Sequence, residues 1–293
     1  MELPLVVGVD GSEPSMRAVD WAADEAALHG VPLRVVYASL WERYEGAALM
    51  PGLGRTSEQV LADRIVEAAA QRAGRREADL KISTEVLAEE PVTALVGESR
   101  NASALVLGTR GRSGIAELLL GSVSLAVAGR ADCPVIVLRG SHDNQARSGM
   151  RQRIVLGVGE GTQNAAAVRF AFQKAQERRV PLEAVRAWRR PAHEIPDHPL
   201  ITGEPARLYE QEAAESLETA LAEAAAEYPS VELHRRTAEG PARAVLLGAS
   251  AGADLLVVGA RRHRGHSGLQ FGRVVHTVLH HAACPVAVVP QPA

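Results

Sequence analysis

Short apolar runs alternate along the first half of the chain with longer alanine-rich segments in which apolar residues recur at the period of a helix. The apolar runs, rich in Val, Ile and Leu, predict strands at 3–9, 33–39, 81–87, 104–107 and 135–138. The periodic segments predict helices at 15–29, 57–73, 91–99 and 122–130, of which the first two stop at Gly30 and Gly74. The strands hardly alternate apolar with polar residues, so helices should cover both faces of the sheet. This pattern predicts a doubly wound α/β fold with a parallel sheet.

The second half of the chain repeats the first. LVVGVDG at 5–11 recurs as IVLGVGE at 154–160, ALVLGTR at 104–110 as LLVVGAR at 255–261, and ADCPVIVL at 131–138 as AACPVAVV at 282–289. The offset between matching residues hardly drifts, from 149 at Gly8 and Gly157 to 151 at Cys133 and Cys284. We therefore predict two tandem copies of one domain, at 1–140 and 154–293, joined by a polar linker at 141–153.

Composition and charge narrow the classes of function. Of the 293 residues 46% are hydrophobic and 23% charged, and the formal net charge of −3 does not favour a protein that binds nucleic acid or an anionic membrane surface. No window approaches the roughly 20 apolar residues of a membrane span, and the start, MELPLVVGVDGS, lacks the features of a secretory signal. The chain has two cysteines, too few for a disulfide framework. We expect a soluble cytoplasmic protein whose partners are small ligands rather than nucleic acid or membrane.

The lysines exclude one large class of phosphate site. The chain contains only Lys81 and Lys174, and neither stands in a Gly-Lys-Ser/Thr context. A Walker-type P-loop is therefore excluded.

Two segments of the first copy follow predicted strands, at the sheet edge where doubly wound proteins bind ligands. Asp10-Gly11-Ser12 comes after the first strand and is either a turn that caps the next helix or a source of a ligand carboxylate. Gly108-x-x-Gly111 comes after the fourth strand, and Gly121-Ser122 follows nine residues later. Glycines permit close approach of backbone, and Ser122 opens a predicted helix whose free N–H groups favour an anion. These groups can bind phosphates without a lysine.

Asp10, the glycine motif of 108–122 and the closing Cys-Pro-Val-Ile-Val strand resemble the universal stress protein family, in its nucleotide-binding branch. The resemblance extends over both copies and so over nearly the whole chain. It implies a five-stranded parallel sheet with helices on both faces in each copy, with ATP, accompanied by Mg²⁺, across the carboxyl edge of the sheet. It also implies that the copies pair through their last strands as a pseudo-dimer within one chain, and that whole chains form homodimers.

The resemblance also assigns roles to residues of the first copy. It implies that Asp10 binds the adenosine part of ATP. The other residues that it puts at the site are Val9 and Ala38 at the adenine, Leu107 and Gly108 at the border of the pocket, and Gly111, Gly121, Ser122, Val123 and Ser124 at the phosphates and ribose.

The second copy departs from this pattern at three positions. Gly159 stands at the position of Asp10, Arg262 at that of Gly111, and Arg273 at that of Ser122. The two arginines either fill the pocket and close it, or bind a different anion, because arginine also binds phosphate well. We expect a weakened or lost ATP site in the second copy.

The sequence does not provide the residues of an enzyme. No serine or cysteine with a histidine base lies near Asp10 or the glycine motif, so we predict no catalytic residue. We also predict no metal site, and interpret His276 and His280, spaced i, i+4, as part of a partly exposed histidine-rich helix. The expected function is that of an ATP-binding regulatory or stress-response protein with slow or no hydrolysis. The alternatives are an ATP-dependent transferase or adenylyl-forming enzyme on a similar fold, and an interaction scaffold without nucleotide.

Overall fold

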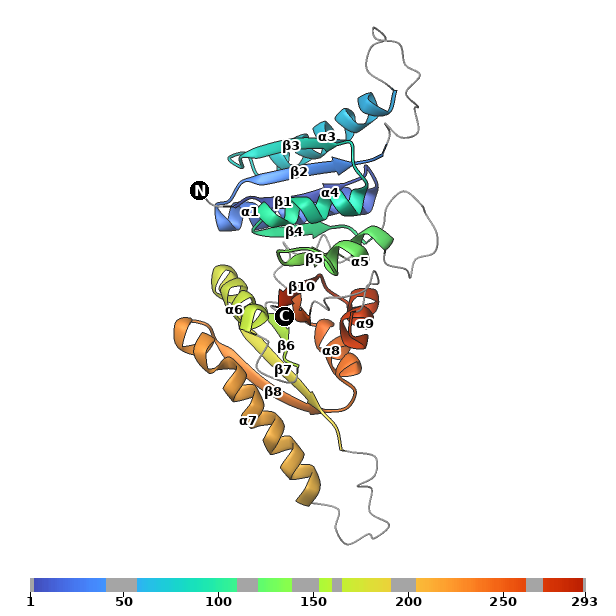
Figure 1. Ribbon diagram of the computed structural model, residues 1–293. Helices are drawn as coiled ribbons and strands as arrows, with labels where there is room; N and C mark the ends of the chain where they lie inside the picture. Colours follow the sequence, from blue (N-terminus) through green and yellow to red (C-terminus); the bar gives the residue numbers. More distant parts are fainter. Residues whose placement is uncertain are drawn as a thin grey trace. The chain divides into compact units, whose positions relative to one another are not determined.

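The computed structural model describes seven stretches of the chain: residues 3–40, 57–109, 121–138, 153–159, 165–190, 204–261 and 271–291. The chain divides into two compact units, Met1–Ser148 and Gly149–Ala293. All of the predicted linker except Arg153 lies outside the described residues. Each unit is an α/β structure (Figure 1). Each also has its own hydrophobic core.

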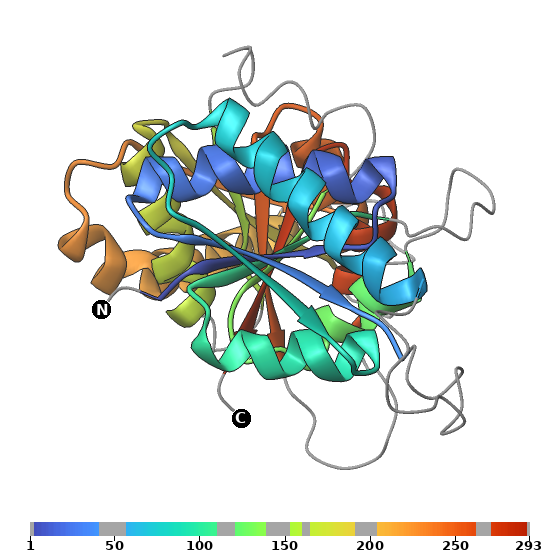
Figure 2. The ribbon, with the colours of Figure 1, turned by 90° about the horizontal axis from the view of Figure 1, so that it is seen from above.

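The first unit is built on a parallel sheet with the strand order β3-β2-β1-β4-β5. Its elements are β1 (Leu5–Val9), α1 (Glu13–His29), β2 (Leu33–Ala38), α3 (Ser57–Arg76), β3 (Ile82–Leu87), α4 (Pro91–Glu98), the 3₁₀ turn Ser99–Asn101, β4 (Ala104–Leu107), α5 (Ser122–Ala128) and β5 (Val135–Val137). Helices α1 and α3 pack together on one face of the sheet, and α4 packs with α5 on the other (Figure 2). The chain winds in both directions from β1, so the switch point of the topology lies between β1 and β4.

The second unit repeats this topology with the strand order β10-β9-β6-β7-β8, also parallel. Its elements are β6 (Ile154–Gly157), α6 (Ala165–Arg178), β7 (Leu182–Trp188), α7 (Glu204–Glu227), β8 (Leu233–Glu239), α8 (Ala242–Ser250), β9 (Leu255–Arg261), α9 (Arg273–His281) and β10 (Val286–Gln291). The two sheets confirm the predicted fold class. One difference lies at the carboxyl edge, because β9 continues through Gly259 to Arg261 whereas β4 ends at Leu107, the residue before the matching Gly108.

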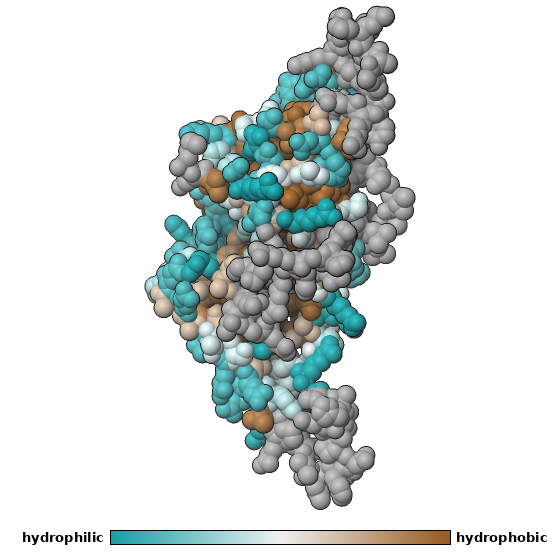
Figure 3. Space-filling model, viewed as in Figure 1, coloured by the Kyte–Doolittle hydropathy of each residue, from teal (hydrophilic) through white to brown (hydrophobic). Residues whose placement is uncertain are grey.

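The core of each unit lies around its central strands. Every residue of β1 and of β4 is buried, as expected for strands with helices on both faces. The edge strands β3 and β8 are only partly buried. On the side drawn in Figure 3, hydrophilic and hydrophobic side chains are mixed over the described surface. Among the helices of the described ranges, none combines the length and the apolar character that a membrane span needs.

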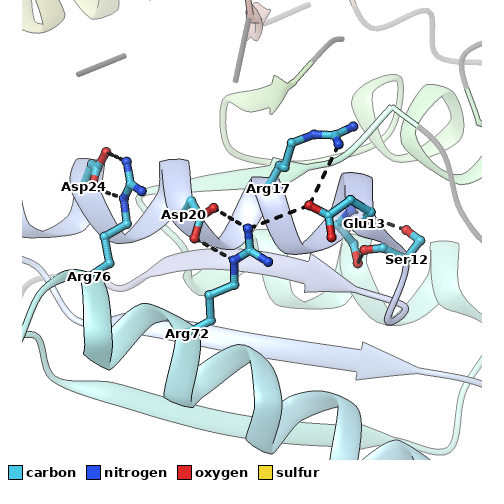
Figure 4. A network of polar contacts seen from close by, with 8 residues as sticks. Ser12, Glu13, Arg17, Asp20, Asp24, Arg72 and Arg76 are labelled. Carbon is cyan, nitrogen blue, oxygen red and sulfur yellow. Dashed lines mark hydrogen bonds and ion pairs between the residues drawn. The ribbon is translucent and has the colours of Figure 1, made fainter. Parts of the chain in front are cut away.

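The two predicted helix stops have different outcomes. Gly30 ends α1 in the left-handed conformation, with φ of 67°, and its N–H bonds back to the last turn, so this prediction is confirmed. The stop at Gly74 is wrong, because α3 continues to Arg76. The extra turn is stabilised from outside the helix, since Arg72 and Arg76 reach across to Asp20 and Asp24 of α1 and each forms a bidentate pair (Figure 4).

A group of three charged side chains joins β2, β3 and α4 in the first unit. Arg34 Nε donates to Glu98 Oε2 at 2.7 Å, and Arg34 Nη2 donates to Glu85 Oε2 at 3.3 Å. The bond to Glu98 is the main cause that raises the pKa of the Arg34 guanidinium. One half-buried cation is thus held between two carboxylates.

The second unit has a similar group with the signs of charge reversed, although its third member, Arg153, lies before β6 and not in the helix that matches α4. Glu183 is the second residue of β7, as Arg34 is of β2, and Arg236 is the fourth residue of β8, as Glu85 is of β3. Glu183 Oε1 accepts from Arg236 Nε at 2.6 Å, and its Oε2 lies 3.2 Å from Arg153 Nε. Here one buried carboxylate is held between two guanidinium groups.

Glu90 forms the amino-terminal cap of α4, a helix that lines the candidate site described below. Its carboxylate accepts from the Thr93 N–H at 2.8 Å and from the Thr93 hydroxyl at 3.0 Å. Burial raises the pKa of Glu90, but the bonds from the Thr93 and Val92 amides outweigh it, so the net pKa is lowered. A carboxylate with a lowered pKa stabilises the fold above its unfolded pKa of about 4.3, and this contribution is lost as the pH falls below that value.

We therefore expect Glu90→Gln to reduce the free energy of unfolding by about 0.5–1 kcal/mol at pH 7. Near pH 3.5 the two proteins should differ less, because the carboxylate of the wild-type protein is then becoming protonated. Urea denaturation at both pH values measures the difference. A loss of the same size at both would show that the charge of Glu90 contributes nothing to the cap.

Candidate functional site

A cavity of about 240 Å³ lies at the carboxyl edge of the sheet in the first unit, at the switch point between β1 and β4. Its lining residues are Gly8, Val9, Asp10, Ser15, Val36, Ala38, Pro91, Leu95, Leu107, Gly108, Gly121, Ser122, Val123 and Ser124. Doubly wound sheets bind their ligands at this place.

The structure brings together nine of the ten residues that the sequence put at a site: Val9, Asp10, Ala38, Leu107, Gly108, Gly121, Ser122, Val123 and Ser124. The tenth, Gly111, lies outside the described residues. Five further lining residues were not predicted from the sequence: Gly8, Ser15, Val36, Pro91 and Leu95. A signal for two of these was available, because Pro91 and Leu95 are four residues apart and so share one face of their predicted helix.

The lining side chains form an apolar group and a polar group. The strands β1, β2 and β4 and the helix α4 contribute apolar side chains, among them Val36, Leu95 and Leu107. The polar side chains come from the segment after β1 and from the start of α5. The cavity can therefore bury an apolar or aromatic group against one part of its wall and bind a hydroxylated or charged group with the other.

The Asp10 carboxylate is held in place by the loop that follows it. Its Oδ1 accepts from the Ser12 N–H at 3.0 Å and from the Ser12 hydroxyl at 2.6 Å. Ser12 also caps α1, because its Oγ accepts from the Ser15 N–H at 3.3 Å. Gly11 has φ of 80°, which allows the tight turn, and Ile65 of α3 packs against it. The predicted turn and helix cap are therefore confirmed, and the Asp10 side chain lines the cavity.

The start of α1, next to this loop, is also fixed by α3. Arg72 Nη2 donates to Asp20 Oδ2 at 2.6 Å and lies 3.8 Å from Glu13 Oε1, while Glu13 in turn pairs with Arg17 (Figure 4). The bond to Asp20 is the main cause that raises the pKa of Arg72. These contacts hold the first turn of α1 against α3, so the position of the Asp10 loop depends on packing between two helices.

The second unit keeps the apolar framework of this site. Gly157 packs against Leu246 and Val258 in the same way that Gly8 packs against Leu95 and Leu107. The polar side chains differ.

At the position of Asp10 the second unit has Gly159, whose carbonyl accepts from Arg186 Nη1 at 2.6 Å. Arg186 lies one residue after Val185 in β7, as Tyr37 lies one residue after Val36 in β2. At the position of the Asp10 carboxylate the second unit therefore has a backbone carbonyl that is bonded to an arginine. Arg186 was not predicted from the sequence, because it is 27 residues away from Gly159 and the two residues meet only in the folded structure.

Of the two arginines predicted to change the second site, the structure describes only Arg273, which is exposed and is the first residue of α9. Arg262 lies outside the described residues. Val275 stands at the position of Ser124, and its side chain is buried. On the same helix the rings of His276 and His280 have their centres 4.4 Å apart. Within the described ranges, no three His, Cys, Asp or Glu side chains are grouped so that they could hold a metal ion.

The fold defines a tandem α/β protein with a cavity at the switch point of its first sheet. The sequence model of the universal stress protein family matches residues 3–139 and 150–290, and the chain belongs to this family, as the sequence motifs predicted. The universal stress protein Rv2005c of Mycobacterium tuberculosis is 33% identical over 306 residues, which cover 98% of this chain and 97% of that protein.

Two further comparisons agree. A universal stress protein of Mycolicibacterium smegmatis is 31% identical over 293 residues, covering 98% of this chain and 97% of the relative. The crystal structure of a universal stress protein from Archaeoglobus fulgidus covers 99% of this chain and 98% of its own, with a TM-score of 0.67 and 18% identity, and it has the same fold.

Proposed function

We propose that this universal stress protein is a regulatory protein that binds ATP in the cavity of the first unit. The observation that carries the proposal is the meeting of nine residues, selected from the sequence for a nucleotide, around one cavity with apolar and polar walls. No lysine is needed, because glycine backbone and serine hydroxyls can bind phosphate oxygens.

Each part of ATP has a matching wall. The adenine ring is flat and apolar on its faces, and it fits against Val9, Val36 and Ala38. The ribose hydroxyls are donors, and Asp10 offers a carboxylate acceptor, which forms stronger hydrogen bonds than a neutral acceptor does. The phosphates then extend toward the wall from Gly121 to Val123, where the Ser122 hydroxyl and the N–H groups of Ser122 and Val123 are donors.

The same residues support binding rather than turnover. Asp10 is the one carboxylate among the described residues that line the cavity, and no histidine is among them. Hydrolysis requires groups that orient water and stabilise the transition state more than the bound nucleotide. Donors that bind the phosphates of the ground state equally well lower the dissociation constant without accelerating a reaction. A protein that binds ATP without converting it can still respond to ATP, because bound ATP stabilises one state of the protein. We therefore propose a regulatory role. The cytoplasmic location and the pairing of whole chains stay predictions.

We expect calorimetric titration of the nucleotide-free protein with ATP to give a stoichiometry near one per chain, because Gly159 and Val275 replace Asp10 and Ser124 in the second unit. Asp10→Asn keeps the size and the bonds to Ser12 but removes the charge. It should weaken binding by about 10- to 100-fold, the value of a charge-assisted hydrogen bond.

Asp79→Asn is the matched control, because Asp79 is exposed just before β3, at the opposite edge of the sheet, and this variant should bind as the wild type does. A stoichiometry of two, or unchanged affinity in Asp10→Asn, would contradict the proposal. Phosphate release from Mg²⁺-ATP in the same samples tests the enzyme alternatives, which would gain support from turnover on the ordinary enzyme scale of about 1 per second or faster.

A further inference from the structure

Two serines act where β1 and β4 separate at the cavity. The parallel pairing of these strands ends at Gly8 and Leu107. Beyond this point the Asp10 N–H bonds to the Ser15 hydroxyl at 3.4 Å, and the Gly108 carbonyl bonds to the Ser124 hydroxyl at 2.8 Å. Each strand end is therefore bound to the beginning of a helix instead of to the other strand.

We propose that Ser15 and Ser124 are positioning residues that fix the ends of β1 and β4 to the starts of α1 and α5 and thereby set the geometry of the cavity. The inference rests on the proposed nucleotide site, and it assigns to Ser124 a role different from the phosphate or ribose contact that the family resemblance implies. The two hydroxyls act on the ligand through Asp10 and Gly108.

The hydrogen bonds of the serines carry the argument. A serine hydroxyl has one hydrogen to donate. Ser124 donates it to the Gly108 carbonyl, and Ser15 donates it to the Ser12 carbonyl at 2.8 Å while accepting from the Asp10 N–H. Their side chains are also well buried, since Ser15 is 4% and Ser124 is 7% exposed. Neither hydroxyl has a proton left to donate to a phosphate.

The backbone at Gly108 has little freedom to adjust. A Cβ on Gly108 would lie 2.8 Å from the Pro14 carbonyl oxygen, so the end of β4 is already in contact with the start of α1. One residue further, the Thr109 carbonyl accepts from the Gly121 N–H at 2.6 Å. The bonds to Gly121 and Ser124 therefore fix the start of α5 relative to the end of β4. These two segments form one wall of the cavity.

The second unit provides an internal comparison. Val275 stands at the position of Ser124 and has no hydroxyl. The pairing of β6 with β9 ends at Gly157 and Val258, as that of β1 with β4 ends at Gly8 and Leu107, so the strands separate there without the serine. The other side of the strand differs, because β9 pairs with β10 through Gly259 to Arg261, whereas β4 pairs with β5 only to Leu107. The unit with the serine thus has its glycine carbonyl bonded to the helix, and the unit without it has the glycine paired in the sheet.

The test compares two variants of nearly equal shape. Ser124→Thr retains a hydroxyl that can bond to the Gly108 carbonyl, whereas Ser124→Val, the residue of the second unit, has none. We expect Ser124→Thr to bind ATP within about threefold of the wild type, and Ser124→Val to bind at least about tenfold more weakly, because a buried carbonyl loses its partner. Ser15→Ala should weaken binding to a similar extent.

Ser99→Ala is the control for loss of a buried serine. Ser99 is also buried and bonds to the Val96 carbonyl and to the Asp132 N–H, away from the cavity, so its removal should reduce stability without changing affinity. Equal affinity of Ser124→Thr and Ser124→Val, whether both retained or both lost, would overturn the inference.

Amide hydrogen exchange without nucleotide separates this inference from the proposed function. In Ser15→Ala the Asp10 amide should exchange at least about tenfold faster than in the wild type, since its acceptor is gone. Failure of the wild-type protein to bind ATP would refute the proposed function, and an unchanged exchange rate at Asp10 would refute the positioning role.

Discussion

Gly108→Ala is expected to lower the free energy of unfolding of the first unit by about 2 kcal/mol. The new Cβ would lie 2.8 Å from the oxygen and 2.9 Å from the carbon of the Pro14 carbonyl, and 3.1 Å from the Ser15 nitrogen. All three are backbone atoms, so no side-chain rotation can relieve the contact. The start of α1 must move, and the Asp10 loop moves with it. Thermal unfolding and ATP titration of the variant should both show a loss.

Gly97→Ala serves as its control in the same unit. Gly97 lies inside α4, and a Cβ there meets no atom within 4 Å. Alanine is the better helix former, so this variant should gain up to about 1 kcal/mol. Opposite signs for the two substitutions would support the close contact at Pro14, and a Gly108→Ala protein as stable as the wild type would exclude it.

Arg34→Glu is expected to cost about 2–3 kcal/mol of stability. The substitution removes the cation between Glu85 and Glu98 and puts a third carboxylate beside them. The side chain of Glu98 is only 19% exposed, so water screens the repulsion incompletely. Chemical denaturation in low salt measures the loss, and added salt should reduce it.

The charges of the second unit suggest a variant that should restore the stability lost in Arg34→Glu. The triple variant Arg34→Glu, Glu85→Arg, Glu98→Ala gives the first unit the charges found at the matching positions of the second, where Ala249 stands in place of Glu98. It should recover most of the lost stability, because the one carboxylate of the group again has an arginine beside it. A triple variant as unstable as Arg34→Glu alone would mean that the arrangement of charges is not what matters.

The sequence predicted those strands and helix ends that are determined by residues close together in the sequence. The strands were found because β1 and β4 are continuous runs of apolar residues, and the end of α1 because Gly30 adopts a conformation that favours glycine. The end of α3 was missed because it depends on Arg76 and Asp24, which are 52 residues apart and meet only in the folded protein. A glycine inside a helix can be accommodated when such contacts extend beyond it.

The site followed the same rule. Asp10, Gly108 and Gly121 belong to motifs that the sequence displays, whereas the bond of Ser124 to Gly108 and the contact of Arg186 with Gly159 join residues that meet only in the folded protein. A residue type and its spacing identify a group that could bind a ligand. Which partner receives the hydrogen of Ser124 depends on the distance between two segments that are 16 residues apart in the sequence.

The reversed charges around Arg34 and Glu183 should also disfavour the pairing of a strand with the wrong repeat while the chain folds. Tandem domains with the same topology can exchange equivalent strands and become trapped in mixed structures. A first repeat that took β7 in place of β2 would put Glu183 against Glu85 and Glu98. A second repeat that took β2 would put Arg34 against Arg236 and Arg153. Both mistakes bring like charges together where water is partly excluded, so each repeat favours its own strands.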